Sequence, residues 1–549
     1  MSAVRFCPRP PSKAIYKNKK DANLSSSFKY RWLSVGDISG SATIIFDNLT
    51  LLTFISIILQ FGYQFPVDII LTKIIPGTVC GVMVGNLLCI WLSFRLAKQE
   101  RRHVTAIPLG IDAPSAIGFI VCIIGPSYQM FKNHDSLTAH NAALMAWHVG
   151  VGSLFVLGLI KLFCGLFVKR IKNFIPQAAL LGGVGGVAIA LIGFFPLVAI
   201  LQMPVIGLIS LVIVILTMIV KVRLPFNLPG IPTAIIVSTI IFYLLIPLGL
   251  SGNMPELSMH LGFLLLIPNF RFFYVMPYVI KVIPLILPFA LLVIFGTMTV
   301  AESAACVGDN YNVRSLVIVD SIATLVSSIF GGIAQTTPYA GFTAYKKMDS
   351  RAGFLIINIL VVGIGGILGL VGFIVNLIPE ASIAPILLYV AFEIMMQGFL
   401  HCDKKYFAPI LFAFLPSIAR LLEIKFTDGT LINVDKLQTD IFNVTHGFSD
   451  QLIIVAMGNG FIITGILWGA MLYFAIERQV IKGFICCIIL AILSYFGIIH
   501  SVFTNGQIYL PLTLPPGISK LPLEFALGYL AMGIIILLSY PLKQSKQLH

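Results

Sequence analysis

Apolar stretches long enough to cross a lipid bilayer recur along the whole chain and constrain its fold more than any other feature. A spanning helix needs about 20 predominantly apolar residues, and on the order of sixteen candidate stretches lie between residues 41 and 541. Only 11% of the residues are charged, whereas soluble domains carry roughly 25%. The sequence therefore predicts an all-α polytopic membrane protein. It excludes a water-soluble multidomain enzyme, a disordered chain and a secreted disulfide scaffold.

The basic residues indicate which side of the membrane each connection faces. The net charge is +14, and the lysines and arginines cluster in every other connection between apolar stretches, as the positive-inside rule requires of cytoplasmic loops. Residues 1–33 are basic and lack an apolar core, so they are interpreted as a cytoplasmic tail and not as a signal peptide. We expect both termini to be cytoplasmic, in a cell (inner) membrane protein. No soluble domain is visible that could carry a nucleic-acid-binding face.

Two of the apolar stretches are interrupted by proline and glycine at corresponding places in two halves of the chain. The first reads Thr105-Ala106-Ile107-Pro108-Leu109-Gly110 and leads to Asp112, and the second reads Gln335-Thr336-Thr337-Pro338-Tyr339-Ala340-Gly341. Each is preceded by a stretch with a lone acid, Asp47 or Glu302. Such matched interruptions are the signature of an inverted-repeat transporter. A single interruption would favour a simple proline kink, but two favour a binding site.

Prolines in mid-membrane free backbone groups that protein or a polar ligand must then satisfy. Two short extended segments, each leading into a half-helix, would bring two positive helix ends together near the midplane. The sequence thus predicts a small polar cavity for a flat, hydrogen-bonding or anionic solute.

Acids inside the bilayer cost roughly 2.5–3.5 kcal/mol each on insertion scales, so each is a functional candidate. These acids are Asp47, Asp112, Glu302, Asp320 and Glu393. Glu393 is equally explained by an interfacial salt bridge, Asp320 by a structural acid bonded to nearby backbone, and Asp309 by a solvated loop acid. Lys161 is expected to extend toward the cytoplasmic end of its helix.

The same residues give the chain a resemblance to a known family. Thr299-Val300-Ala301-Glu302, Val319-Asp320-Ser321 with Phe330-Gly331-Gly332, and Thr336-Thr337-Pro338-Tyr339 resemble motifs of the nucleobase–cation symporter-2 family, the xanthine/uracil/ascorbate permeases. The resemblance covers about residues 34–476. Two departures stand out, because Ala340 and Gly341 replace an acid found in relatives, and Cys306 replaces a histidine.

The resemblance implies a fold of two inverted repeats of seven segments, with a core domain that moves against a gate domain. The expected divisions are a tail at 1–33, a first repeat at 34–250, an external loop at 251–281, a second repeat at 282–476, and additional C-terminal helices with a short tail at 477–549. The expected substrate-binding residues are Glu302, Thr105, Ile107, Thr336, Thr337, Tyr339, Ala340 and Gly341. The expected coupling-ion or supporting residues are Asp47, Asn48, Asp112 and Asp320.

The function predicted from the sequence is cation-coupled transport of a nucleobase-like solute by alternating access, with H⁺ or Na⁺ as the coupling ion. The expected partners are the solute and the lipid bilayer, with a homodimer also compatible. No cofactor or metal is expected. The alternative is an anion transporter of the same fold for sulfate, bicarbonate or a carboxylate, which Glu302 opposes electrostatically. A membrane-embedded enzyme has less support because HExxH and GxSxG motifs are missing. A passive channel or receptor is the remaining alternative.

Overall fold

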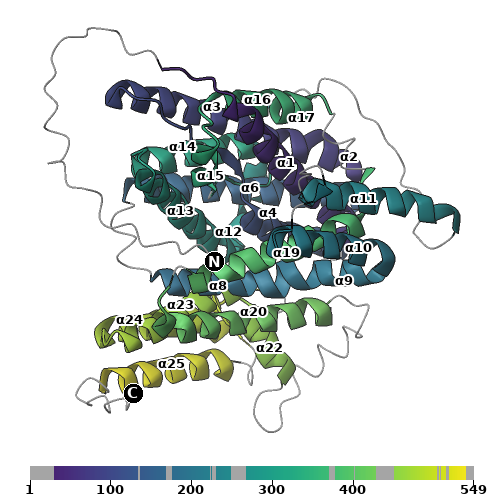
Figure 1. Cartoon of the computed structure of the whole chain (residues 1–549). Coiled ribbons are helices and arrows are strands. Elements are labelled where there is room, and N and C mark those ends of the chain that lie inside the picture. Colours follow the sequence, from purple (N-terminus) through teal and green to yellow (C-terminus); the bar gives the residue numbers. More distant parts are fainter. Residues whose placement is uncertain are drawn as a thin grey trace, which may run out of the picture.

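The computed structural model arranges its helices, which run in several directions, in three layers (Figure 1). It describes residues 30–538, except 134–136, 168–175, 223, 226–229, 249–266, 340, 370–376, 401, 428–449, 504–505, 507 and 515–518. The core layer holds the two interrupted segments, the middle layer forms the gate, and two C-terminal helices form the third layer (Figure 1).

The first half of the core begins with α1 and ends with the long helix α6. Its elements are α1 (Gly36–Ile57), η1 (Ile58–Gly62), α2 (Val67–Ile69), η2 (Ile70–Ile74), α3 (Ile75–Glu100), β1 (Leu109–Ile111), α4 (Ala113–Phe119), η3 (Ile120–Ile124), α5 (Gly125–Asn133) and α6 (Ala139–Leu166). The residues from α4 to α5 form one continuous helical run that begins directly after β1.

The second half of the core repeats this order. Its elements are η8 (Arg271–Val275), α12 (Met276–Lys281), α13 (Ile283–Cys306), α14 (Val313–Ile329), β2 (Thr336–Pro338), α15 (Phe342–Lys347), α16 (Gly353–Asn358), η9 (Ile359–Ile364) and α17 (Gly365–Ile367). Helix α14 packs against α3 and α6, and α16 packs against α1. The two halves are therefore interleaved.

The two interrupted segments meet as a pair of short antiparallel strands. Leu109 pairs with Pro338, Gly110 with Thr337, and Ile111 with Thr336. Prolines explain the extended backbone, because the residue before a proline is disfavoured in helical conformation. The expectation that the third and tenth segments are broken is confirmed.

The gate layer is built from the remaining helices of each half. Its elements are α8 (Gln177–Val187), η4 (Ala188–Gly193), α9 (Phe194–Gln202), α10 (Pro204–Val214), η5 (Ile215–Ile219), α11 (Gly230–Leu245), η7 (Ile246–Leu248), α19 (Glu380–Leu400), η10 (Lys404–Tyr406), α20 (Phe407–Thr427), α22 (Asp450–Gly458) and α23 (Phe461–Ile476). Glycines bring its helices close together, since a Cβ at Gly182 would lie 2.9 Å from the Ala413 Cβ. The gate meets the core where α13 packs against α8 and α23.

The third layer consists of α24 (Val480–Tyr495), η11 (Pro511–Thr513) and α25 (Lys520–Leu538). Its connecting loop enters the junction of α22 and α23, where the chain bends by 85°. The Asn459 side chain in this bend donates hydrogen bonds to the carbonyls of Ser501 and Phe503, at 2.9 and 2.8 Å. The His500 ring bonds to the Tyr529 hydroxyl at 2.7 Å and stacks on Phe525. These hydrogen bonds and the ring stacking connect the C-terminal helices to the gate.

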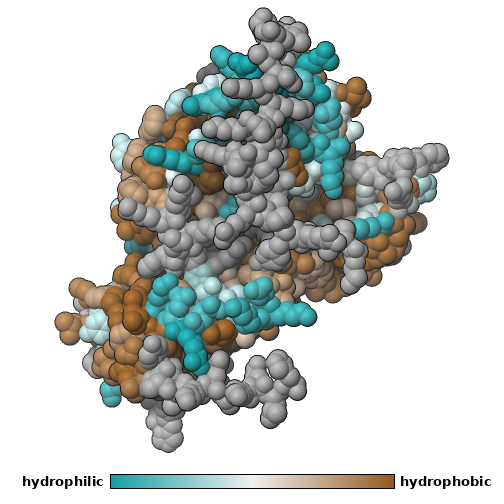
Figure 2. All heavy atoms as spheres, turned by 60° about the vertical axis from the view of Figure 1, so that its left-hand side comes forward, coloured by the Kyte–Doolittle hydropathy of each residue, from teal (hydrophilic) through white to brown (hydrophobic). Residues whose placement is uncertain are grey.

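Eight helices within the described residues are long and apolar enough to cross a membrane, or nine if α22 and α23 count as one span. Four further apolar helices in the described part of the chain are shorter. The interrupted segments divide what hydropathy alone presents as continuous stretches. Hydrophobic residues cover broad areas of the face in Figure 2, with hydrophilic residues gathered in patches. The protein is a multi-pass membrane protein.

Candidate functional site

The outer edge of β1 is completed by side chains rather than by a third strand. The Leu109 N–H donates to the Asn86 Oδ1 at 3.1 Å, and the Asn86 amide donates to the Leu109 carbonyl at 2.9 Å. The Ile111 N–H donates to the Asn48 Oδ1 at 3.2 Å. Both asparagines are fully buried. They satisfy backbone groups that would otherwise lack partners away from water.

The edge of β2 is completed by the ammonium of Lys161 on α6. Its Nζ lies 2.7 Å from the Asp320 Oδ2 and donates to the Thr324 hydroxyl and the Thr336 carbonyl, at 3.0 and 3.1 Å. The Lys161 side chain is 0% exposed. All three of its donors therefore have an oxygen partner, and one side chain joins α6, α14 and β2.

Thr336 adds a second link between β2 and α14. Its hydroxyl donates to the Asp320 Oδ1 at 3.0 Å, and it lies 3.3 Å from the hydroxyl of Thr324. Lys161, Asp320, Thr324 and Thr336 therefore form one buried polar cluster, which we call the Lys161 cluster. A buried polar network of this kind fixes one arrangement of its elements when its members are satisfied.

Asp112 connects the end of β1 to the start of α4. Its carboxylate accepts a hydrogen bond from the Ser115 N–H at 3.0 Å, as a helix N-cap does. The Asp112 N–H donates to the Gln335 carbonyl at 3.0 Å. A carboxylate at this position complements the positive end of the α4 helix dipole.

A second polar network holds the end of the core that the charge pattern predicts to be cytoplasmic. Asp309 is fully buried, and its carboxylate accepts hydrogen bonds from Arg102 at 2.7 Å, from Lys346 at 2.7 and 2.9 Å, and from the Thr105 N–H at 3.1 Å. The Thr105 carbonyl accepts from the Tyr311 hydroxyl at 2.7 Å.

The carboxylates of Asp309 and Glu100 keep Arg102 charged and in place in this network. Partial burial opposes the charged form, but hydrogen bonds to Asp309 and then Glu100 raise the pKa of the Arg102 guanidinium above its ordinary value. The network fixes the chain that leads into β1.

The structure divides the expected substrate-binding residues into two groups. Thr336 and Thr337 lie on β2, and the Tyr339 N–H extends the pairing by donating to the Pro108 carbonyl at 2.8 Å. Gly341 directly precedes α15. Thr105 and Ile107 are buried ahead of β1, where Thr105 belongs to the Asp309 network. Ala340 lies outside the described residues.

The two lone acids lie on helices beside the strand pair. Asp47 is half-buried on α1, next to Asn48, which bonds to β1. Glu302 is exposed on α13, while its neighbours Ala301 and Ala304 pack in a cluster that includes Leu109 and Phe342. Glu302 therefore lies on the surface of the core domain near the strand pair. The side chain of Glu393 is not among those described.

Three interpretations of charged residues were wrong. Lys161 does not extend toward the cytoplasm, because its ion pair and hydrogen bonds keep it inside the core. Asp320 bonds to Lys161 and Thr336 rather than to nearby backbone. Asp309 is not solvated, because two cations and a backbone N–H enclose it.

Asn86 and Lys161 were missed as site residues. The signal for both was a strongly polar side chain in an otherwise apolar helix. No group of three His, Cys, Asp or Glu side chains among the described residues could hold a metal ion.

Comparison with known proteins finds likeness only at the level of structure. No protein-family model and no curated protein sequence matches the chain. The solved structure of SLC26A9 superposes with a TM-score of 0.51 at 13% identity, covering 79% of this chain and 64% of SLC26A9. The transmembrane domain of a cyanobacterium bicarbonate transporter, BicA, gives a TM-score of 0.49 at 19% identity, covering 71% of this chain and 96% of that domain.

The fold predicted from the sequence is confirmed: the chain has the inverted-repeat transporter fold with core and gate domains and two additional C-terminal helices. The identification as a nucleobase–cation symporter-2 member and the prediction of a cation-coupled nucleobase symporter are wrong, because the solved structure that shares this fold is SLC26A9. The quoted motifs specify where helices break and where small residues pack. They specify the solute only weakly.

Replacing Asn86 tests whether its side chain completes β1. We expect Asn86→Leu to lower the free energy of unfolding by about 2–6 kcal/mol, because it leaves two buried backbone groups unpaired at about 1–3 kcal/mol each. The measurement is thermal and denaturant unfolding of the purified protein in detergent.

Asn358→Leu is the matched control. Asn358 is also fully buried in a core helix, but its side-chain amide has no hydrogen-bond partner among the described residues. It should be tolerated or stabilising. Equal losses in the two variants would contradict the proposed difference between them.

Breaking the Lys161 cluster on one side should be more damaging than neutralising both sides. Lys161→Met leaves the Asp320 charge buried without a partner, which costs about 3–5 kcal/mol of unfolding free energy. Adding Asp320→Asn removes that charge and should recover part of the loss. The same unfolding measurements apply, and a double variant no more stable than the single one would show that the ion pair is not the source of the stability.

Proposed function

We propose that the protein is a secondary transporter for small anions, of the size of sulfate, bicarbonate or a small carboxylate. The observation that carries the proposal is the meeting of two helix-starting segments at the strand pair. The helical run from α4 to α5 and the helix α15 both begin within a few residues of the paired strands. Helix N-termini carry partial positive charge, and discontinuous helices that present these ends are a recurring solution for anionic substrates.

The fixed carboxylates of the core are largely neutralised within it, which supports an anionic solute. Lys161 neutralises Asp320, and Arg102 and Lys346 surround Asp309. The Asp112 carboxylate lies at the start of α4 and offsets part of the positive charge of that helix end, so the start of α15 is the less occupied of the two. Two further acids, Asp47 and Glu302, lie on the helices beside the strand pair. These two side chains would then limit how strongly an anion binds.

The core and gate domains provide the moving parts. Hydrogen bonds join both strands to α1, α3, α6 and α14, so these elements can move as one body with the bound solute. The gate helices pack closely through glycines. Alternating access by movement of the core against the gate fits this division.

A dissolved coupling cation is not required in this proposal. The Lys161 ammonium is surrounded by a carboxylate, a hydroxyl and a backbone carbonyl oxygen, which are the oxygen ligands that a hard cation prefers. The chain therefore supplies its own cation beside β2. The charge pattern supports a cell membrane location with both termini cytoplasmic.

Transport can be tested with purified protein in liposomes loaded with unlabelled anion. We expect labelled sulfate, bicarbonate or a small carboxylate to enter faster than in protein-free liposomes, while uracil and xanthine do not. Replacing external sodium by choline should leave the rate unchanged. Absence of uptake for every anion would refute the proposed function, and a requirement for sodium would refute only the resident-cation argument.

Glu302→Gln gives opposite results for an anion and a neutral base. A carboxylate that lay about 12 Å from a bound anion would oppose it by about 1.4 kcal/mol at an effective dielectric of about 20, and the variant removes that repulsion. The KM for the anion should then fall by up to roughly tenfold. A neutral base held by hydrogen bonds to Glu302 would instead lose affinity. A raised KM in this variant would contradict the anion proposal, and Glu524→Gln on α25 serves as the control.

A further inference from the structure

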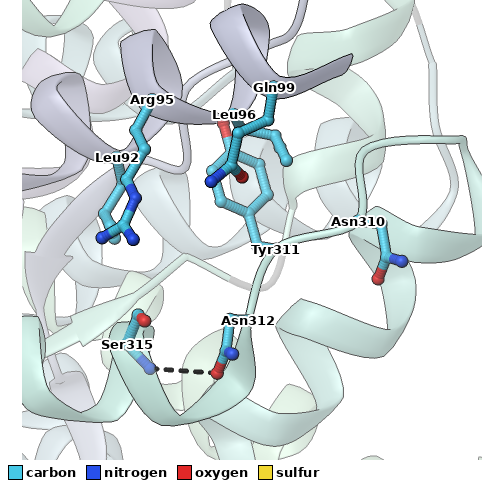
Figure 3. A pocket seen from close by; sticks show the side chains of 8 residues that line it. All are labelled: Leu92, Arg95, Leu96, Gln99, Asn310, Tyr311, Asn312 and Ser315. Atoms are coloured by element: carbon cyan, nitrogen blue, oxygen red, sulfur yellow. Dashed lines mark hydrogen bonds between the residues drawn. The ribbon is translucent and has the colours of Figure 1, made fainter.

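A cavity of about 170 Å³ lies between the end of α3 and the start of α14. Its lining residues are Leu92, Arg95, Leu96, Gln99, Asn310, Tyr311, Asn312 and Ser315 (Figure 3). Arg95 and Gln99 project from α3 toward the segment that carries Asn312 and Ser315 (Figure 3). The volume is large enough for a phosphate group with hydrogen-bonding waters, since one water occupies about 30 Å³ in the liquid.

The lining is suited to an anion. Within the part of the chain that the structure describes, the Arg95 guanidinium makes no hydrogen bond or ion pair, and its contact is with the Trp91 ring at 5.7 Å. Arginine is the side chain best shaped for phosphate, because its planar fork can donate two parallel hydrogen bonds. Gln99, Asn310 and Asn312 add amide donors around the same space.

The charges around the cavity are also positive. Lys98 and Arg314 are exposed, and each is next in sequence to a lining residue or within two positions of one. The nearest acids are already engaged, since Glu100 pairs with Arg102 and Asp309 is enclosed by Arg102 and Lys346. A phosphate here would meet cations without an opposing free carboxylate.

The position of the cavity relative to the membrane identifies the source of the phosphate. It lies at the end of α3 that the charge pattern predicts to be cytoplasmic. On the same helix, Leu87, Trp91 and Phe94 are 51%, 55% and 40% exposed, as expected for side chains that face lipid. An exposed tryptophan is typical of the membrane interface, and basic pockets between helices on the cytoplasmic side bind acidic headgroups.

We propose that this cavity binds the phosphate headgroup of an acidic phospholipid in the cytoplasmic leaflet. The headgroup bridges Arg95 on α3 and the Asn310–Ser315 segment before α14. Tyr311 in that segment donates to the Thr105 carbonyl. The bound lipid thereby stabilises the position of the segment that leads into β1. None of its lining residues is among those assigned to transport, and its occupancy can be measured without any transport.

The test uses full-length protein in detergent, titrated with phosphatidylglycerol or phosphatidylcholine and followed by native mass spectrometry. Wild-type protein should prefer phosphatidylglycerol. Arg95→Gln should weaken phosphatidylglycerol binding about fivefold, the ratio expected for one basic residue near an acidic lipid surface. Ser315→Glu places a carboxylate in the cavity while keeping Arg95, and it should weaken phosphatidylglycerol binding by a similar factor. This variant tests the proposal if Arg95→Gln folds poorly.

Arg478→Gln, an exposed arginine at the end of α23, is the matched control and should bind like wild type. The proposal is overturned if wild type shows no preference for phosphatidylglycerol, if both cavity variants bind like wild type, or if Arg478→Gln loses as much as Arg95→Gln. A final comparison replaces the lipid with inorganic phosphate. If it stabilises the wild-type protein against heat as strongly as phosphatidylglycerol does, the site takes free phosphate and the lipid assignment is wrong.

Discussion

A pair of strands in the interior of a membrane protein can persist only if every backbone group along its outer edges has a partner. Pairing between β1 and β2 satisfies their facing edges, but no third strand among the described residues pairs with the other edges. Asn48 and Asn86 complete β1, and Lys161 completes β2. Three side chains from three different helices therefore determine where the strands lie. The two half-helices, and any site between them, depend on this arrangement.

This way of completing the strands has a mechanical consequence. Since the partners of the strands come from α1, α3 and α6, the strands cannot shift without breaking buried hydrogen bonds in several helices at once. The Asp309 network adds a second attachment at one end of the core. Movement between core and gate is less restricted, because their contact is made by packed helices such as α13 against α8 and α23. A structure of this kind favours rigid-body movement of the core over local rearrangement of the strand pair.

Residues that act through the backbone were predictable from the sequence, whereas residues that act through distant partners were not. Pro108 and Pro338 disfavour helical backbone at the residue before each of them, and both lie among glycines and threonines, so the interrupted segments could be located before the structure was known. The role of Lys161 depends on Asp320 and Thr336, which are more than 150 positions away along the chain. Asp309 likewise acquires its partners Arg102 and Lys346 only in the folded core. Without those partners, a lysine near a helix end and an acid in a loop have ordinary explanations.

The error about the solute has the same physical origin. Thr336, Thr337 and Pro338 build the second strand, and a strand built in this way can face a nucleobase or an anion equally well. What distinguishes the two solutes is the balance of charge around the strands. That balance depends on pairings such as Lys161 with Asp320, which turn a formally acidic set of side chains into a largely neutral one. Glu302 alone weighed against an anion in the sequence, and the pairing of the other core acids could not be read there.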